Sequence, residues 1–187
     1  GPFTTVKNSH GVKSSIGLGG SYMLDSGYAG LSFSRYDNDY GVPGEHAESD
    51  TLIEMESDRF EFRSELEITD SDWLTGIEFN FGYGDYKHSE SGYETENNVT
   101  EWHTHATYLR EGFEGKIVLS HEIGELSGVI GFHGLLDEFK IVGEESIFGG
   151  LVENDKILSE DRTKLGVFVI EEYQLDDSTK INGGLRF

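Results

Sequence analysis

Hydrophobic and polar residues alternate along most of the chain, in paired segments joined by turn residues. In one segment large apolar side chains alternate with charged ones: Phe60, Phe62, Leu66 and Ile68 against Arg59, Glu61, Arg63, Glu65 and Glu67. A period of two residues predicts a β-strand with one apolar and one polar face. The pattern predicts eight strands, at approximately 12–24, 27–36, 58–68, 73–86, 105–121, 126–140, 162–174 and 179–187. We therefore expect an all-β fold, an antiparallel up-and-down meander of about eight strands in four hairpins.

The connections between these strands fall into two classes. Short ones consist of turn residues, at 25–27, 69–72, 124–125 and 176–178. Long acidic segments cover 37–58, 85–101 and 141–161. Strict alternation of short and long connections is typical of outer-membrane barrels, which have short periplasmic turns and longer external loops. We expect the three long loops at one end of the sheet and the four turns at the other.

The alternation alone leaves open which face meets water. A soluble sandwich points its polar face outward, whereas a transmembrane barrel points apolar residues to lipid and polar ones to the lumen. Aromatic residues near the expected strand ends favour the membrane interpretation, because amphipathic rings prefer the headgroup level. These residues are Tyr36, Tyr83, Tyr86 and Tyr108 near the long loops, and Tyr22, Tyr28, Trp73 and Tyr173 near the turns.

Composition narrows the function classes. The chain has no cysteine, which excludes disulfides and thiolate metal sites. Acidic residues outnumber basic ones by 36 to 14, and a net charge of -22 argues against a nucleic-acid partner. No apolar run is long enough for a membrane helix. Because Gly1-Pro2 stands without an initiator Met or a secretory signal, we interpret 1–10 as a cloning scar and leader and 11–187 as the β-barrel section.

Several motifs resemble the barrel of TonB-dependent outer-membrane receptors, most closely the zinc-uptake branch and more distantly haem and siderophore receptors. The motifs are SRYDNDYGVPG at 34–44, GYGDYKH at 82–88, GFEGK at 112–116, VGEE at 142–145, GVFVIEEY at 166–173 and GGLRF at 183–187. The resemblance implies a bacterial outer-membrane location, lipid as a partner, and uptake of a metal ion or metal complex.

The chain also departs from that family. Its receptors resemble barrels of about 22 strands plugged by an N-terminal domain. Eight strands, without a plug or an energy-coupling box, resemble only a section of such a barrel, and TonB would be contacted only through the absent plug. Open strand edges are costly and aggregation-prone, so we expect the edges near 12–24 and 179–187 to pair with each other or with another copy.

Histidines at the long loops suggest metal chemistry. The three loops hold more than half of the acidic residues, which form either a solvated surface or an anionic funnel for divalent cations. His103 and His105 share one side of an extended strand, and Glu101 or Glu96 could complete a zinc shell. His46 and His88 are further candidate ligands from the first and second loops. Imidazole with carboxylate suits zinc, nickel or copper, and a single His could ligate haem; either would be a transported substrate, and no resident cofactor is expected.

An enzyme is not expected. Glu171 and Glu172 are adjacent in a strand and so point to opposite faces, which excludes an acid/base pair. The sequence contains no nucleophile elbow, phosphate loop or His-Glu-x-x-His helix. Two alternatives to the receptor section remain open: a self-contained eight-stranded outer-membrane barrel with a structural or adhesive role, and a soluble ligand-binding β-barrel whose apolar faces point inward.

Overall fold

The computed structural model describes residues 6–43, 50–96, 99–143, 146–147, 150–151 and 155–187, and these form β-strands joined by turns. The strands are β1 (Gly11–Leu24), β2 (Gly27–Gly41), β3 (Leu52–Glu67), β4 (Leu74–Glu96), β5 (Val99–Ile123), β6 (Leu126–Gly143), β7 (Ser146–Ile147), β8 (Gly150–Leu151), β9 (Asp155–Asp176) and β10 (Thr179–Arg186). The described residues contain no helix long and apolar enough to span a membrane. The all-β class is thereby confirmed.

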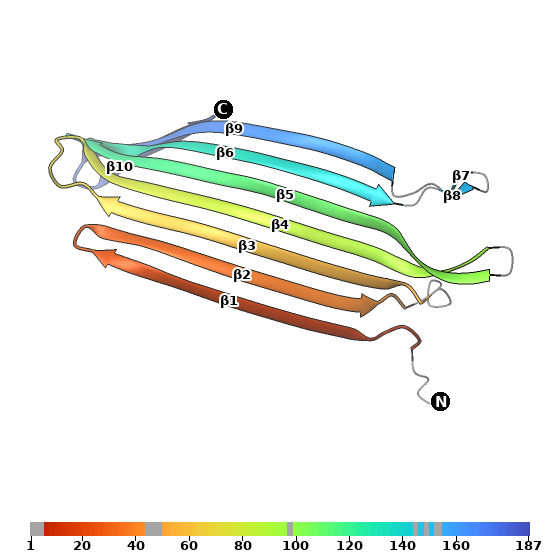
Figure 1. Ribbon diagram of the computed structural model, residues 1–187. Helices are drawn as coiled ribbons and strands as arrows, with labels where there is room; N and C mark the ends of the chain where they lie inside the picture. Colours follow the sequence, from red (N-terminus) through yellow and green to blue (C-terminus); the bar gives the residue numbers. More distant parts are fainter. Residues whose placement is uncertain (1–5, 44–49, 97–98, 144–145, 148–149, 152–154) are drawn as a thin grey trace, which may run out of the picture.

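Eight of the strands form one antiparallel sheet in the order β1-β2-β3-β4-β5-β6-β9-β10, while β7 and β8 pair only with each other. Each strand of the large sheet therefore pairs with its neighbours along the chain, which confirms the up-and-down meander (Figure 1). The four tight turns lie at one end and the connections predicted as long loops at the other, as expected. The sheet does not close: among the described residues β1 pairs only with β2, and β10 only with β9.

The loop boundaries predicted from sequence are wrong. Most of 37–58 and 85–101 is strand, because β2 continues to Gly41, β3 begins at Leu52, and β4 and β5 reach Glu96 and Val99. In 141–161, β6 continues to Gly143 and β9 begins at Asp155. Backbone pairing satisfies N–H and C=O groups whatever the side chains are. The acidic residues of these segments predict loops, although Ile53 and Met55 alternate with Glu54 and Glu56 as in a strand.

Pairing register fixes two faces of the sheet. Phe62 pairs with Phe81, and Ser64 with Phe79, which brings the rings of Phe62 and Phe79 within 5.7 Å. The expected face partition is confirmed: Phe60, Phe62, Ile77, Phe79 and Phe81 share the apolar face, and Glu61, Arg63, Glu65, Glu78 and Asn80 share the polar face. Paired residues lie on the same face, so the register assigns the residues of every other strand of the meander to one of these two faces.

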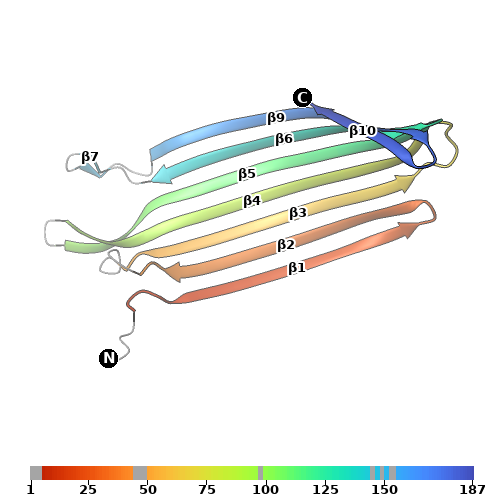
Figure 2. The same cartoon turned by 180° about the vertical axis from the view of Figure 1, so that it is seen from behind.

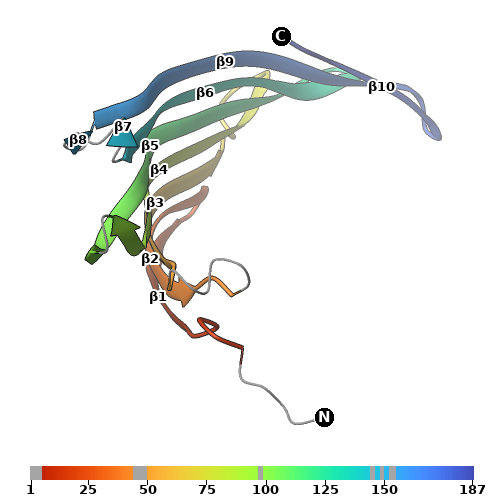
Figure 3. The same ribbon diagram turned by 90° about the vertical axis from the view of Figure 1, so that its right-hand side faces the viewer.

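The sheet is a single layer bent into an open arc. Figure 2 shows it from behind, with no second layer, and Figure 3 shows the arc that the strands form from β1 to β9. A hollow of about 540 Å³ on the polar face is lined by residues from β3 through β10, including Arg59 and Arg186, and we call this face the hollow side. In the described part of the chain the buried large apolar residues are Ile53, 6% exposed, and Val118, 8% exposed. The apolar face is uncovered, with Leu165 as much as 82% exposed.

Candidate functional site

A row of carboxylates bounds the apolar face toward the loop end. Neighbouring strands place five acidic residues directly opposite one another on the outward face, and we call them the acid row: Asp58, Asp85, Glu111, Glu138 and Asp161. The adjacent row on the turn side holds Leu18, Phe33, Phe60, Tyr83, Phe113 and Leu136. The outward face thus changes from aromatic and aliphatic to acidic within two residues on the four consecutive strands β3 to β6.

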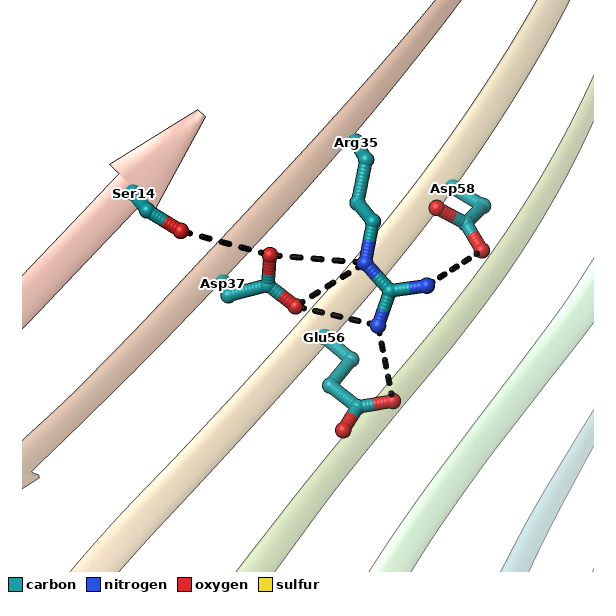
Figure 4. A network of polar contacts seen from close by, with 5 residues as sticks. All are labelled: Ser14, Arg35, Asp37, Glu56 and Asp58. Atoms are coloured by element: carbon teal, nitrogen blue, oxygen red, sulfur yellow. Dashed lines mark hydrogen bonds and ion pairs between the residues drawn. The ribbon is translucent and has the colours of Figure 1, made fainter. Parts of the chain in front are cut away.

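Arg35 continues the acid row onto β2 and offsets part of its charge. Its Nε and Nη2 atoms each lie 3.1 Å from Asp37 Oδ1, while Nη1 lies 3.4 Å from Asp58 and Nη2 lies 3.6 Å from Glu56 (Figure 4). Ser14 on β1 donates to Asp37 at 3.4 Å. Because like charges directly opposite each other destabilise a sheet, this cation stabilises the β1–β3 end of the row. Farther along, Lys140 lies 2.7 Å from Glu138 and offsets part of the charge at the other end of the row.

On the loop side of the acid row the two faces of the sheet exchange character. The outward face now carries charged and hydroxyl residues, while the hollow side carries an aromatic and aliphatic cluster: Tyr36, Tyr40, Met55, Tyr86, Tyr108, Phe139 and Ile141. Of the four tyrosines expected as an outward girdle at the loop end, only Tyr83 faces outward. The other three have the opposite parity and line the hollow, so that part of the girdle expectation was wrong.

His88 lies within this cluster on the hollow side. Its Nδ1 is 3.3 Å from the Tyr86 hydroxyl, and its ring centroid is 5.2 Å from that of Tyr108. Nε2 is buried, makes no hydrogen bond and lies 3.5 Å from a Glu90 carboxylate oxygen. Imidazole and carboxylate at this separation form half of a zinc-type ligand set.

A second imidazole–carboxylate pair lies farther along the same hairpin. His103 Nε2 is 3.7 Å from Glu101 Oε2. Glu90 pairs with Ala106 and Ser91 with Thr104, so His105 is an extra residue in a β-bulge. Alternation from Thr104 puts His103 and His105 on the hollow side, the side of His88. The expectation that His103 and His105 share a side is therefore consistent with the register.

The structure does not gather the candidate ligands into one shell. His88 pairs with Tyr108, and Gly92 with His103, so the two imidazoles are separated by four residues of strand, or roughly 13 Å. No three His, Asp or Glu side chains in the described part of the chain form a metal-sized group. Glu96 pairs with Val99 through its backbone, but its side chain and the whole of His46 lie outside the described residues.

Sequence reasoning missed Glu90 and the two tyrosines beside His88. The signal was available, because Tyr86, His88 and Glu90 alternate and must share a side of any strand. The prediction of 85–101 as a loop hides this signal, because alternate residues share a face only in a strand.

The rest of the hollow side is lined by paired charges. Asp137 accepts hydrogen bonds from Arg110 at 2.9 Å and from Arg162 at 2.7 Å and 2.9 Å, and His133 lies 2.8 Å from Glu114. These pairs make a hydrophilic inner wall below the aromatic cluster. No family model and no curated protein matches the chain.

Proposed function

We propose that this chain is a barrel section of a TonB-dependent outer-membrane receptor, and that its loop-end residues contribute to capture of a metal ion or metal complex. The observation that carries the membrane part is the uncovered apolar face ending at the acid row. A soluble protein rarely exposes so large an apolar surface. An apolar outward face with a polar inner wall is the arrangement of transmembrane β-barrels.

The height of the apolar band supports this proposal. On β6 the band runs from Gly128 to Glu138 in the acid row. Gly128 marks its turn-side limit, because its partners on the neighbouring strands are His121 and Glu171, which lie 3.1 Å apart. The about ten residues of this band measure roughly 34 Å along the strand. At a tilt of about 45° they span about 24 Å, and a membrane strand needs about 9–11 residues. The soluble-barrel alternative requires apolar residues on the hollow side, opposite the apolar band. The ion pairs of Asp137 and His133 lie there instead.

Metal capture is supported by the two imidazole–carboxylate pairs on the hollow side of β4 and β5. Nitrogen and carboxylate ligands without thiolate suit zinc and related divalent ions. The acidic surface at the same end raises the local concentration of cations. The resemblance to the zinc-uptake branch makes zinc the first ion to test.

Zinc titration calorimetry on the chain in detergent near neutral pH tests the capture proposal. His103→Ala/His105→Ala should weaken zinc binding strongly, because it removes two imidazoles from one hairpin. His133→Ala is the matched control, since it also breaks a histidine–carboxylate pair but lies below the aromatic cluster. Equal heats and affinities for the native chain and the double variant would refute the assignment.

The membrane part has its own test, flotation with phospholipid vesicles. The refolded chain should float with the vesicles and should precipitate without lipid or detergent. A monodisperse, detergent-free solution of the chain would contradict the proposal.

A further inference from the structure

The end of the β4–β5 hairpin extends beyond the rest of the sheet. β3 pairs with β4 only as far as Ser91, and β6 pairs with β5 only from Ala106. Among the described residues, 92–96 pair beyond these positions only with 99–103, and we call this two-stranded segment the arm. A two-stranded ribbon without packing is marginally stable. Each strand of the arm therefore has one neighbouring strand among the described residues, and Gly92 at its base is buried.

The β-bulge lies at the base of the arm. His105 is the extra residue, between the Ser89–Thr107 hydroxyl contact at 3.2 Å and the Ser91–Thr104 contact at 3.1 Å. A bulge interrupts the ladder, bends the strand and increases its twist. The irregularity thus falls between the two imidazole–carboxylate pairs, with His88 and Glu90 on the sheet side and Glu101 and His103 on the arm.

The arm is splayed in this structure. In Figure 3 the described ends of β4 and β5 lie away from the concave side of the arc. Both pairs nevertheless belong to the hollow side of the same two strands, and Glu90 lies between His88 and the position of His103 along the hairpin. Bending at the bulge toward the hollow side would shorten the separation of about 13 Å that keeps the pairs apart.

We propose that a divalent cation, zinc in the first instance, closes the arm at the bulge and is held by His88 and Glu90 together with Glu101 and His103. This inference rests on the proposed function and adds how the site is completed. Two imidazole nitrogens and two carboxylate oxygens make a four-coordinate zinc site, with bonds of about 2.0–2.2 Å. Either pair alone supplies too few ligands for tight binding.

The aromatic pair of the arm does not oppose this movement. Tyr93 and Trp102 pair across the arm with ring centroids 4.9 Å apart, on the outward side of the ribbon. Both rings move with the arm, so closure does not separate them. Bending is confined to a position where the ladder is already irregular.

The test combines zinc stoichiometry with a distance measurement. The chain has no cysteine, so Ser34→Cys on β2 and Thr100→Cys on the arm can carry two unique spin labels. Saturating zinc should bind once per chain and shorten the label distance. His88→Ala and His103→Ala should each abolish both effects, and the double variant should be no worse than either single one. His133→Ala should leave both effects intact.

The possible outcomes separate this inference from the proposed function. Zinc binding with an unchanged label distance would overturn arm closure but leave metal capture standing. Two zinc ions per chain, one lost in each single variant, would show independent half-sites and would also overturn closure. Absence of zinc binding by the native chain would refute metal capture and closure together.

Discussion

Phe132 lies near the middle of the outward apolar band, and Phe132→Arg should strongly destabilise the chain in a bilayer. Its row holds Ile117 and Val167, and its own side chain is 48% exposed on the face assigned to lipid. Along β6 it stands four residues from Gly128 and six from the acid-row residue Glu138. An arginine at the bilayer midplane on the lipid face of a barrel costs about 2–4 kcal/mol. We expect a loss of that size in the free energy of unfolding.

Two matched variants test the reasoning. Leu136→Arg places the same charge on the same face next to the acid row, where the cost falls to about 0–1 kcal/mol. His133→Arg places it on the hollow side of the adjacent position, where the change should stay within about 0.5 kcal/mol. The assay is denaturant unfolding in phospholipid vesicles, followed by fluorescence of the two tryptophans. A Phe132→Arg loss no larger than that of His133→Arg would refute an outward, lipid-facing band.

Three further predictions concern other parts of the sheet. Gly131→Ala should cost about 1–3 kcal/mol of the free energy of unfolding, because an added Cβ would meet the Phe168 ring at 1.9 Å; Gly183→Ala, with nothing within 4 Å, is its control in the same unfolding assay. Trp102→Ala should destabilise the arm by about 0.5–1.5 kcal/mol through loss of its cross-strand ring pair, seen as faster amide hydrogen exchange in the arm and unchanged exchange elsewhere. The backbone N–H two residues later lowers the pKa of the Asp176 carboxyl, so its stabilisation is present above the ordinary pKa and is lost as the pH falls through the lowered value; thermal unfolding of Asp176→Asn should show less of this acid-range loss.

The sequence was sufficient to predict the strands that have an apolar face. Phe60 and Phe62 against Glu61 and Arg63 specify a strand and its two sides, because a slip of one residue would expose the wrong face. Glu54 and Glu56 stand in an acidic segment predicted as a loop, yet they are strand residues paired with β2 and β4. Their alternation with Ile53 and Met55 is the strand signal, and the density of acidic residues hides it.

The candidate site was predicted in part for the same reason. The alternation of side chains in a strand was enough to put His103 and His105 on one side. The bulge at His105 depends on how β5 pairs with β4, and a single strand carries no mark of it. The distance between His88 and His103 depends likewise on register across the hairpin, so the sequence could suggest the ligands but not their division into two pairs.

The acid row also has a mechanical consequence for the sheet. Neighbouring carboxylates one strand apart, about 4.8 Å by sheet spacing, repel one another along the line of pairing. On the outer side of a bent sheet side chains fan apart, whereas in a flat sheet they would stand parallel and closer. The repulsion that Arg35 and Lys140 leave uncompensated within the row therefore favours the curved form of the sheet over the flat one.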